Sequence, residues 1–209
     1  MSIPIESYLT FFAASVVLAL APGPDNIFVL TQSALRGRRA GLLITLGLCT
    51  GLVVHTGAVV VGVAAIFQTS AVAFTALKLV GAGYLLYLAW QAFRASASPI
   101  RAEVEAAVAG WRLYRRGIVM NVTNPKVSIF FLAFLPQFAD PKRGALALQL
   151  ISLGAGFIVA TLIVFGSIAL AAGAIGSWLA RSRRAQIVIN RVAGAIFAGL
   201  ALKLAASER

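Results

Sequence analysis

Six long apolar segments constrain the fold of this chain more than any other feature of its sequence. Each is long enough, with few enough charges, to cross the roughly 30 Å hydrocarbon core of a bilayer as a helix. They cover residues 6–35, 40–66, 71–92, 117–138, 145–177 and 185–206. Of the 209 residues, 60 % are hydrophobic and 11 % are charged, and a soluble domain of this length cannot bury so much apolar surface. We therefore predict an all-α, polytopic membrane protein with six transmembrane helices.

The net charge of +12 is distributed unevenly along the chain. Eleven arginines fall in the first, third and fifth connections between these segments, and they are Arg36, Arg38, Arg39, Arg94, Arg101, Arg112, Arg115, Arg116, Arg181, Arg183 and Arg184. The second connection holds no charge, and the fourth holds only Asp140, Lys142 and Arg143. Cytoplasmic loops are enriched in Lys and Arg, so we predict that both termini face outward. The basic charge thus indicates topology rather than a nucleic-acid partner.

The two halves of the chain resemble each other, and we predict one transmembrane domain over residues 1–209. Repeat one covers about 1–92, repeat two covers about 117–209, and a cytoplasmic linker spans about 93–116. When Pro24 is placed on Pro125, GPDNIFVL aligns with TNPKVSIFF, and KLVGAGYLLYLA aligns with RVAGAIFAGLAL in the last span of each half. Three spans per half is an odd number, so the second half must cross the membrane in the opposite sense. This predicts a 3+3 inverted repeat, a layout typical of secondary transporters with a site at the bilayer midplane.

Spans one and four each contain a helix-breaking proline motif. Proline has no amide hydrogen, so it frees a backbone carbonyl that must find another partner, because lipid offers none. A half-helix beginning at such a break directs its positive end at the site and suits a carboxylate ligand. Two kinked helices that merely pack together are the alternative, but the symmetry of the two breaks favours a function. The predicted substrate and proton pathway consists of Pro22, Gly23, Pro24, Asp25, Asn26, Gln32, Lys78, Asn121, Asn124, Pro125, Lys126, Asn190 and Arg191.

Charged residues within spans are rare and usually functional. Asp25 follows one break and Lys126 the other, so the repeat places opposite charges at equivalent positions. We expect them to face each other within ~4–6 Å, which would lower the cost of burying each charge. Lys78 and Arg191 are also equivalent, and they either line the cavity or extend to the membrane surface. His55, the only histidine, either relays protons or packs as a hydrogen-bonded residue.

An enzyme is a poor match for these residues. Intramembrane catalysis needs a base, a nucleophile or a metal cluster, and this chain offers one histidine, one cysteine and one mid-span carboxylate. Cys49 cannot form an internal disulfide and has no metal-ligand neighbours. It lies between Gly47 and Gly51, whose spacing is that of a helix-packing motif. We predict no enzymatic activity, no metal and no cofactor.

Four stretches resemble the LysE/RhtB family of bacterial amino-acid exporters: APGPDN, RGRRAGLLITLG, KLVGAGYLLYLAW and GIVMNVTNPKVSIFFLAFLPQF. The similarity extends over nearly the whole chain and is greatest to the homoserine/threonine/leucine branch. It implies a multi-pass efflux carrier of the bacterial plasma (inner) membrane, a homodimer that exports amino acids or their derivatives by proton antiport. The motif residues of the family fall on 22–26 and 124–126. A passive channel, or an exporter of another small solute or ion, is the alternative on the same scaffold.

Overall fold

A computed structural model of the chain describes residues 3–21, 23–69, 71–96 and 109–206. Over these ranges every regular element is a helix, which confirms the predicted all-α class. The α-helices are α1 (Ile5–Leu20), α2 (Pro24–Arg36), α3 (Arg38–Thr69), α4 (Ala71–Arg94), α5 (Gly110–Val122), α6 (Pro125–Ile129), α7 (Leu146–Arg181) and α8 (Arg183–Ala206). Between α6 and α7 lie the π-helix η1 (Phe130–Phe134) and two 3₁₀ turns, η2 (Leu135–Phe138) and η3 (Pro141–Arg143).

The helices account for the predicted apolar segments to different degrees. Helices α3, α7 and α8 are each long and apolar enough to cross a membrane. Two bent pairs meet the same criterion when each counts as one span: α1 with α2, bent by 60°, and α5 with residues 125–138, bent by 51°. The described part of the chain therefore contains three to five candidate spans. The remaining predicted span corresponds to α4, a helix of 24 residues that is not among these candidates.

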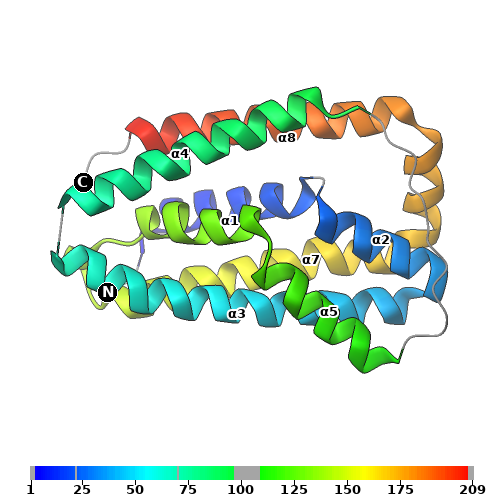
Figure 1. Cartoon of the computed structure of the whole chain (residues 1–209), viewed down its shortest axis with the longest axis horizontal. Coiled ribbons are helices and arrows are strands. Elements are labelled where there is room, and N and C mark those ends of the chain that lie inside the picture. The colour runs from blue at the N-terminus through cyan, green and yellow to red at the C-terminus, as the bar shows by residue number, and fades with distance from the viewer. Residues whose placement is uncertain (1–2, 22, 70, 97–108, 207–209) are drawn as a thin grey trace.

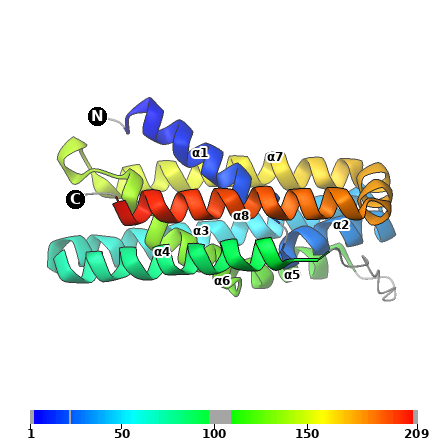
Figure 2. The same ribbon diagram turned by 90° about the horizontal axis from the view of Figure 1, so that it is seen from above.

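The long helices run back and forth between two ends of the molecule (Figure 1). The start of α1 and the end of α8 lie at one end, whereas α2, α4 and α7 end and α3, α5 and α8 begin toward the other, and Figure 2 shows the same division. Helix α3 packs along α7, and α4 packs along α8. Helix α3 also packs against α5, while α7 packs against α1 and α2. The helix ends that flank the arginine-rich connections therefore lie toward one end of the molecule.

Helix α5 begins earlier than the apolar pattern predicts. Residues 110–116, which we expected in the linker, form its first two turns. Leu113 and Gly117 are buried, whereas the arginines at 112, 115 and 116 are exposed. This spacing of one turn is that of an amphipathic helix, which a search for continuous apolar runs does not detect. The rest of the predicted linker, residues 97–108, lies outside the described residues.

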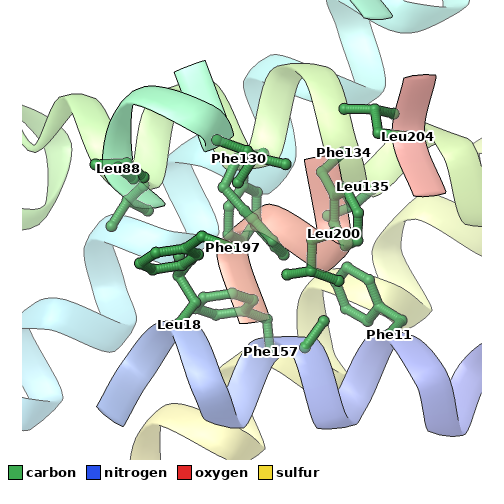
Figure 3. Packing of buried hydrophobic residues seen from close by; sticks show 14 of the residues in the cluster. Phe11, Leu18, Leu88, Phe130, Phe134, Leu135, Phe157, Phe197, Leu200 and Leu204 are labelled. Atoms are coloured by element: carbon green, nitrogen blue, oxygen red, sulfur yellow. The ribbon is translucent and has the colours of Figure 1, made fainter. Parts of the chain in front are cut away.

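An aromatic core holds the second half of span four in place (Figure 3). Phe130 and Phe134 of η1 have ring centroids 4.6 Å apart, and Phe130 lies 6.1 Å from Phe11 of α1 and 5.6 Å from Phe157 of α7. Tilted aromatic pairs at these separations add to the free energy of burial. Leu200 of α8 belongs to the same cluster. The short, irregular segment after Pro125 is thus fixed by packing against three longer helices.

Helices α3 and α5 cross with their backbones in contact. A Cβ atom added to Gly117 would lie 2.5 Å from the carbonyl oxygen of Ile44, and one added to Gly47 would meet the carbonyl of Tyr114. One turn further on, a Cβ at Gly51 would lie 2.6 Å from Oδ1 of Asn121. Only glycine fits at such a crossing, so the motif predicted from Gly47 and Gly51 is confirmed as a helix-packing surface. This crossing places the end of α5 directly against α3.

Candidate functional site

The first break separates α1 from α2 within span one. Helix α2 begins at Pro24, preceded by Gly23 in an extended conformation. Because Pro24 has no amide hydrogen, the carbonyl of Leu20, four residues earlier, has no helical donor. The first helical amide of α2 is that of Ile27, which donates to the carbonyl of Gly23 at 3.1 Å. The amides of residues 25 and 26 therefore point out of the N-terminal end of α2 without a partner in the helix.

The second break separates α5 from α6 within span four. Helix α6 begins at Pro125, and the side chain of Asn124 caps it by accepting a hydrogen bond from the amide of Lys126 at 3.0 Å. The carbonyl that Pro125 leaves without its helical donor is that of Asn121. It accepts instead from the amide of Asn124 at 3.1 Å and lies 3.1 Å from Nε2 of His55. Both breaks thus have proline at the first position of the second half-helix.

The structure brings the two breaks together through three side chain contacts. Nδ2 of Asn124 donates to Oδ2 of Asp25 at 2.9 Å, and both residues are buried. Nζ of Lys126 donates to the carbonyls of Leu18 and Ala21, at 3.2 Å and 3.1 Å. These carbonyls lie at the C-terminal end of α1, which carries the negative end of the helix dipole and is stabilised by a cation. Side chains at the second break therefore donate hydrogen bonds to the carboxylate and the backbone carbonyls at the first break.

The expected contact between Asp25 and Lys126 takes a different form. Both residues are described, and they form no ion pair within 4.0 Å. The carboxylate is held by Asn124, while the ammonium reaches past it to the end of α1. A Cβ added to Gly23 would lie 3.3 Å from Nζ of Lys126, so a glycine at this position leaves room for the lysine side chain. The two charges belong to one cluster but are bound to separate partners.

The cluster has more acceptors than donors. Oδ1 of Asp25 is buried without a hydrogen-bond partner, as are Oδ1 of Asn26 and Oδ1 of Asn121. The amide of Asn26 is already used, since its Nδ2 donates to the carbonyl of Ala19 at 2.6 Å. Buried acceptors without donors are costly. They suit a ligand that brings N–H groups, such as an ammonium. Among the described residues, no three His, Cys, Asp or Glu side chains are grouped as metal ligands would be.

The remaining predicted residues differ in their relation to this cluster. Gln32 is buried seven residues after Asp25 on α2, on the same side of the helix, and its Oε1 has no partner. Lys78 is half-buried on α4. On α8, Asn190 is buried and Arg191 is exposed, and in the described structure neither donates to or accepts from the cluster. Pro22, which we also predict as a site residue, lies outside the described residues.

Sequence reasoning missed the backbone acceptors of Lys126 and left the role of His55 open. The positions of the two prolines are a sequence signal for the contacts of Lys126 and of His55. Each proline removes the donor of the carbonyl four residues earlier, so a polar side chain from elsewhere can donate near Leu20 and near Asn121. Which side chain fills each place depends on how the helices pack, and the sequence pattern does not contain that information.

Comparison with known proteins assigns the chain to a family. The family model described as LysE type translocator matches residues 16–208. The chain belongs to the LysE family. Together with the apolar helices, this makes it a multi-pass membrane protein. The family match begins within α1, at residue 16, and includes both breaks.

Several relatives match nearly the full length of this LysE family member. A homoserine/homoserine lactone efflux protein of Salmonella typhi is 34 % identical over 92 % of each chain. A membrane protein of Vibrio cholerae is 32 % identical over 98 % of each chain. A leucine efflux protein of Salmonella choleraesuis is 28 % identical over 96 % of this chain and 95 % of its own. No solved structure matches the chain.

Proposed function

We propose that this protein is a secondary transporter that exports amino acids or their derivatives across the bacterial plasma membrane by proton antiport. The observation that carries the proposal is the buried Asp25–Asn124 contact, which joins the two broken spans in a member of the LysE family. Relatives named for the efflux of homoserine, homoserine lactone and leucine support amino acids as the substrate class. The same relatives favour export over import.

The proposed architecture is a 3+3 inverted repeat of six spans with both termini outside. Equivalent helices of the two halves pair with each other, α3 with α7 and α4 with α8. The breaks bend the equivalent spans by similar angles, 60° and 51°. The helix ends that flank the three arginine-rich connections lie toward one end of the molecule, which suits a single cytoplasmic face. Assembly as a homodimer in the bilayer is a further part of this proposal.

In the proposed site, an amino acid binds between the two breaks. Its ammonium would meet Oδ1 of Asp25, the buried acceptor that has no partner. Its carboxylate would meet the amides at the N-terminal end of α2 that have no partner within the helix, where the helix dipole favours an anion. Broken helices whose ends bind the charged groups of a substrate are the usual design of such transporters. Side-chain specificity would then depend on residues around this point.

Proton coupling would use Asp25, the carboxylate at the site. When the site is open to the cytoplasm, the ammonium of the substrate binds the ionised carboxylate. When it is open to the outside, a proton replaces the ammonium on Asp25 and the substrate leaves. The protonated carboxyl returns inward and releases the proton to the cytoplasm. Asn124 can stay bound throughout, since its amide donates to Oδ2 in either state.

Proteoliposomes containing the purified protein test this function. With an acidic lumen, they should accumulate a labelled amino acid from a panel of candidates against its gradient, and collapsing the pH gradient with an ionophore should abolish accumulation. Asp25→Asn should abolish accumulation while still exchanging labelled for unlabelled substrate, because exchange moves no net proton. If Asp25→Asn accumulates substrate as well as wild type, Asp25 is not the proton site. Equilibration without accumulation in wild type would instead indicate a passive channel.

A further inference from the structure

We propose that His55 is a positioning residue that supplies a side-chain donor, beside the backbone amide of Asn124, to the carbonyl that Pro125 leaves without its helical donor. Nε2 of His55 lies 3.1 Å from the carbonyl oxygen of Asn121, and the histidine is only 9 % exposed. That carbonyl lies four residues before position 125. In a continuous helix the amide at position 125 would donate to it, but proline has no amide hydrogen. The side chain on α3 therefore adds a donor from outside the broken span to the one that the amide of Asn124 provides.

The geometry determines the role of the ring. A carbonyl oxygen can only accept, so Nε2 must carry the hydrogen. The ring is also packed against Phe131 of η1, with centroids 5.6 Å apart, which fixes its orientation.

The two breaks obtain their missing donors in different ways. At the end of α1, the donors come from the partner break and from the same span, through Lys126 and Asn26. At the end of α5, the side-chain donor comes from α3, a continuous helix that belongs to neither broken span. The close α3–α5 crossing at Gly51 and Asn121 brings the two helices near enough for this contact.

The His55 contact is connected to the proposed substrate site through Asn124. Asn121 lies three residues before Asn124, and the amide of Asn124 shares the same carbonyl oxygen. Asn124 in turn holds Asp25. Loss of the His55 contact should let the end of α5 shift and thereby move Asn124 away from Asp25. The effect on transport rests on the proposed function, whereas the effect on stability does not.

A double-mutant comparison with Pro125→Ala tests the inference. Alanine at position 125 restores an amide that can donate to the carbonyl of Asn121, so the His55 contact becomes redundant. His55→Leu should lower the apparent midpoint of thermal unfolding in detergent by roughly 2–6 °C in the wild-type background, and by less than half as much in the Pro125→Ala background. Thr45→Val is the matched control on α3, because its buried hydroxyl bonds only to Gly41 of the same helix, at 2.9 Å. Its effect should be equal in both backgrounds.

Transport measurements separate positioning from simple stabilisation. His55→Leu should reduce the rate at saturating substrate in proteoliposomes by roughly three- to tenfold, and His55→Gln, whose amide can donate, should recover most of it. The inference is overturned if His55→Leu destabilises the protein equally with and without Pro125, or if His55→Gln fails as His55→Leu does. Absence of amino-acid transport in wild type would contradict the proposed function and leave the stability comparison as the test.

Discussion

The hydrogen bond from Asn124 to Asp25 is the contact on which the joining of the two breaks most depends. Asn124→Ala removes the amide that donates to Asp25 at 2.9 Å and the oxygen that caps the amide of Lys126 at 3.0 Å. A hydrogen bond to a charged group contributes about 1.5–3 kcal/mol, and loss of an N-cap costs about 0.5–2 kcal/mol. We expect a combined loss of roughly 2–5 kcal/mol, which corresponds to a fall of roughly 5–15 °C in the apparent unfolding midpoint.

Three further variants separate the parts of this contact. Asn124→Ser keeps a capping oxygen but removes the amide, so it should lose only the part due to Asp25. Asn124→Asp places two carboxylates at the 2.9 Å contact, a repulsion of up to roughly 6 kcal/mol at an effective dielectric constant of about 20 if both are ionised. The exchange variant Asp25→Asn/Asn124→Asp reverses donor and acceptor and keeps the cap. Its midpoint should lie within about 3 °C of wild type.

Thermal unfolding in one detergent, followed by the loss of the monodisperse peak in size-exclusion chromatography, is a suitable assay for all four variants. The expected order of midpoints runs from the exchange variant through Asn124→Ser and Asn124→Ala to Asn124→Asp. An exchange variant that unfolds as early as Asn124→Ala would refute the reasoning, because it retains a carboxylate and an amide in the same contact. Equal midpoints for Asn124→Ser and wild type would show that the amide contributes nothing.

Further predictions concern topology, the breaks and the lysine. In a cysteine-free background, a single cysteine at Ser207 should react with an impermeant thiol reagent in intact cells, whereas one at Ser98 should not; the reverse result would invert the orientation. Pro24→Ala and Pro125→Ala should each abolish transport but not membrane expression, because joined half-helices have no amides free for substrate. Wild-type transport rates in both variants would contradict the half-helix site. Lys126→Met should lower the unfolding midpoint even when Asp25 is also replaced by Asn, since its two partners are α1 carbonyls. Full rescue in that double variant would show that the charge of Asp25 matters more than the two carbonyls.

The sequence was sufficient to predict the helices and the two breaks, because both depend on local chemistry. An apolar run of about 20 residues predicts a span wherever it occurs, and proline interrupts a helix whatever surrounds it. The start of α5 was predicted too late, because the search considered only continuous apolar runs. Arginines on one side of the helix hide the buried stripe that contains Leu113 and Gly117 from a search for continuous apolar runs.

The partners within the site could not be predicted, because they depend on how each helix is rotated and how far each side chain reaches. The predicted repeat places Asp25 and Lys126 at equivalent positions, and we expected the opposite charges to face each other within ~4–6 Å. A lysine side chain is long enough to pass a nearby carboxylate, and the end of α1 offers it two carbonyls. The shorter Asn124 is left to bind Asp25. The packing of the helices determines which side chain binds the carboxylate and which binds the carbonyls.

The two breaks are alike in their backbones but not in their chemistry. The first broken span contributes acceptors to the contact, the carboxylate of Asp25 and the carbonyls at the end of α1, while the second contributes the donors of Asn124 and Lys126. If the halves move against each other during transport as we propose, these bonds must either travel with the site or break. A substrate ammonium or a proton binds the same carboxylate that Asn124 holds. Occupancy of Asp25 can therefore alter the strength of the link between the repeats, and through it the equilibrium between the two orientations of the site.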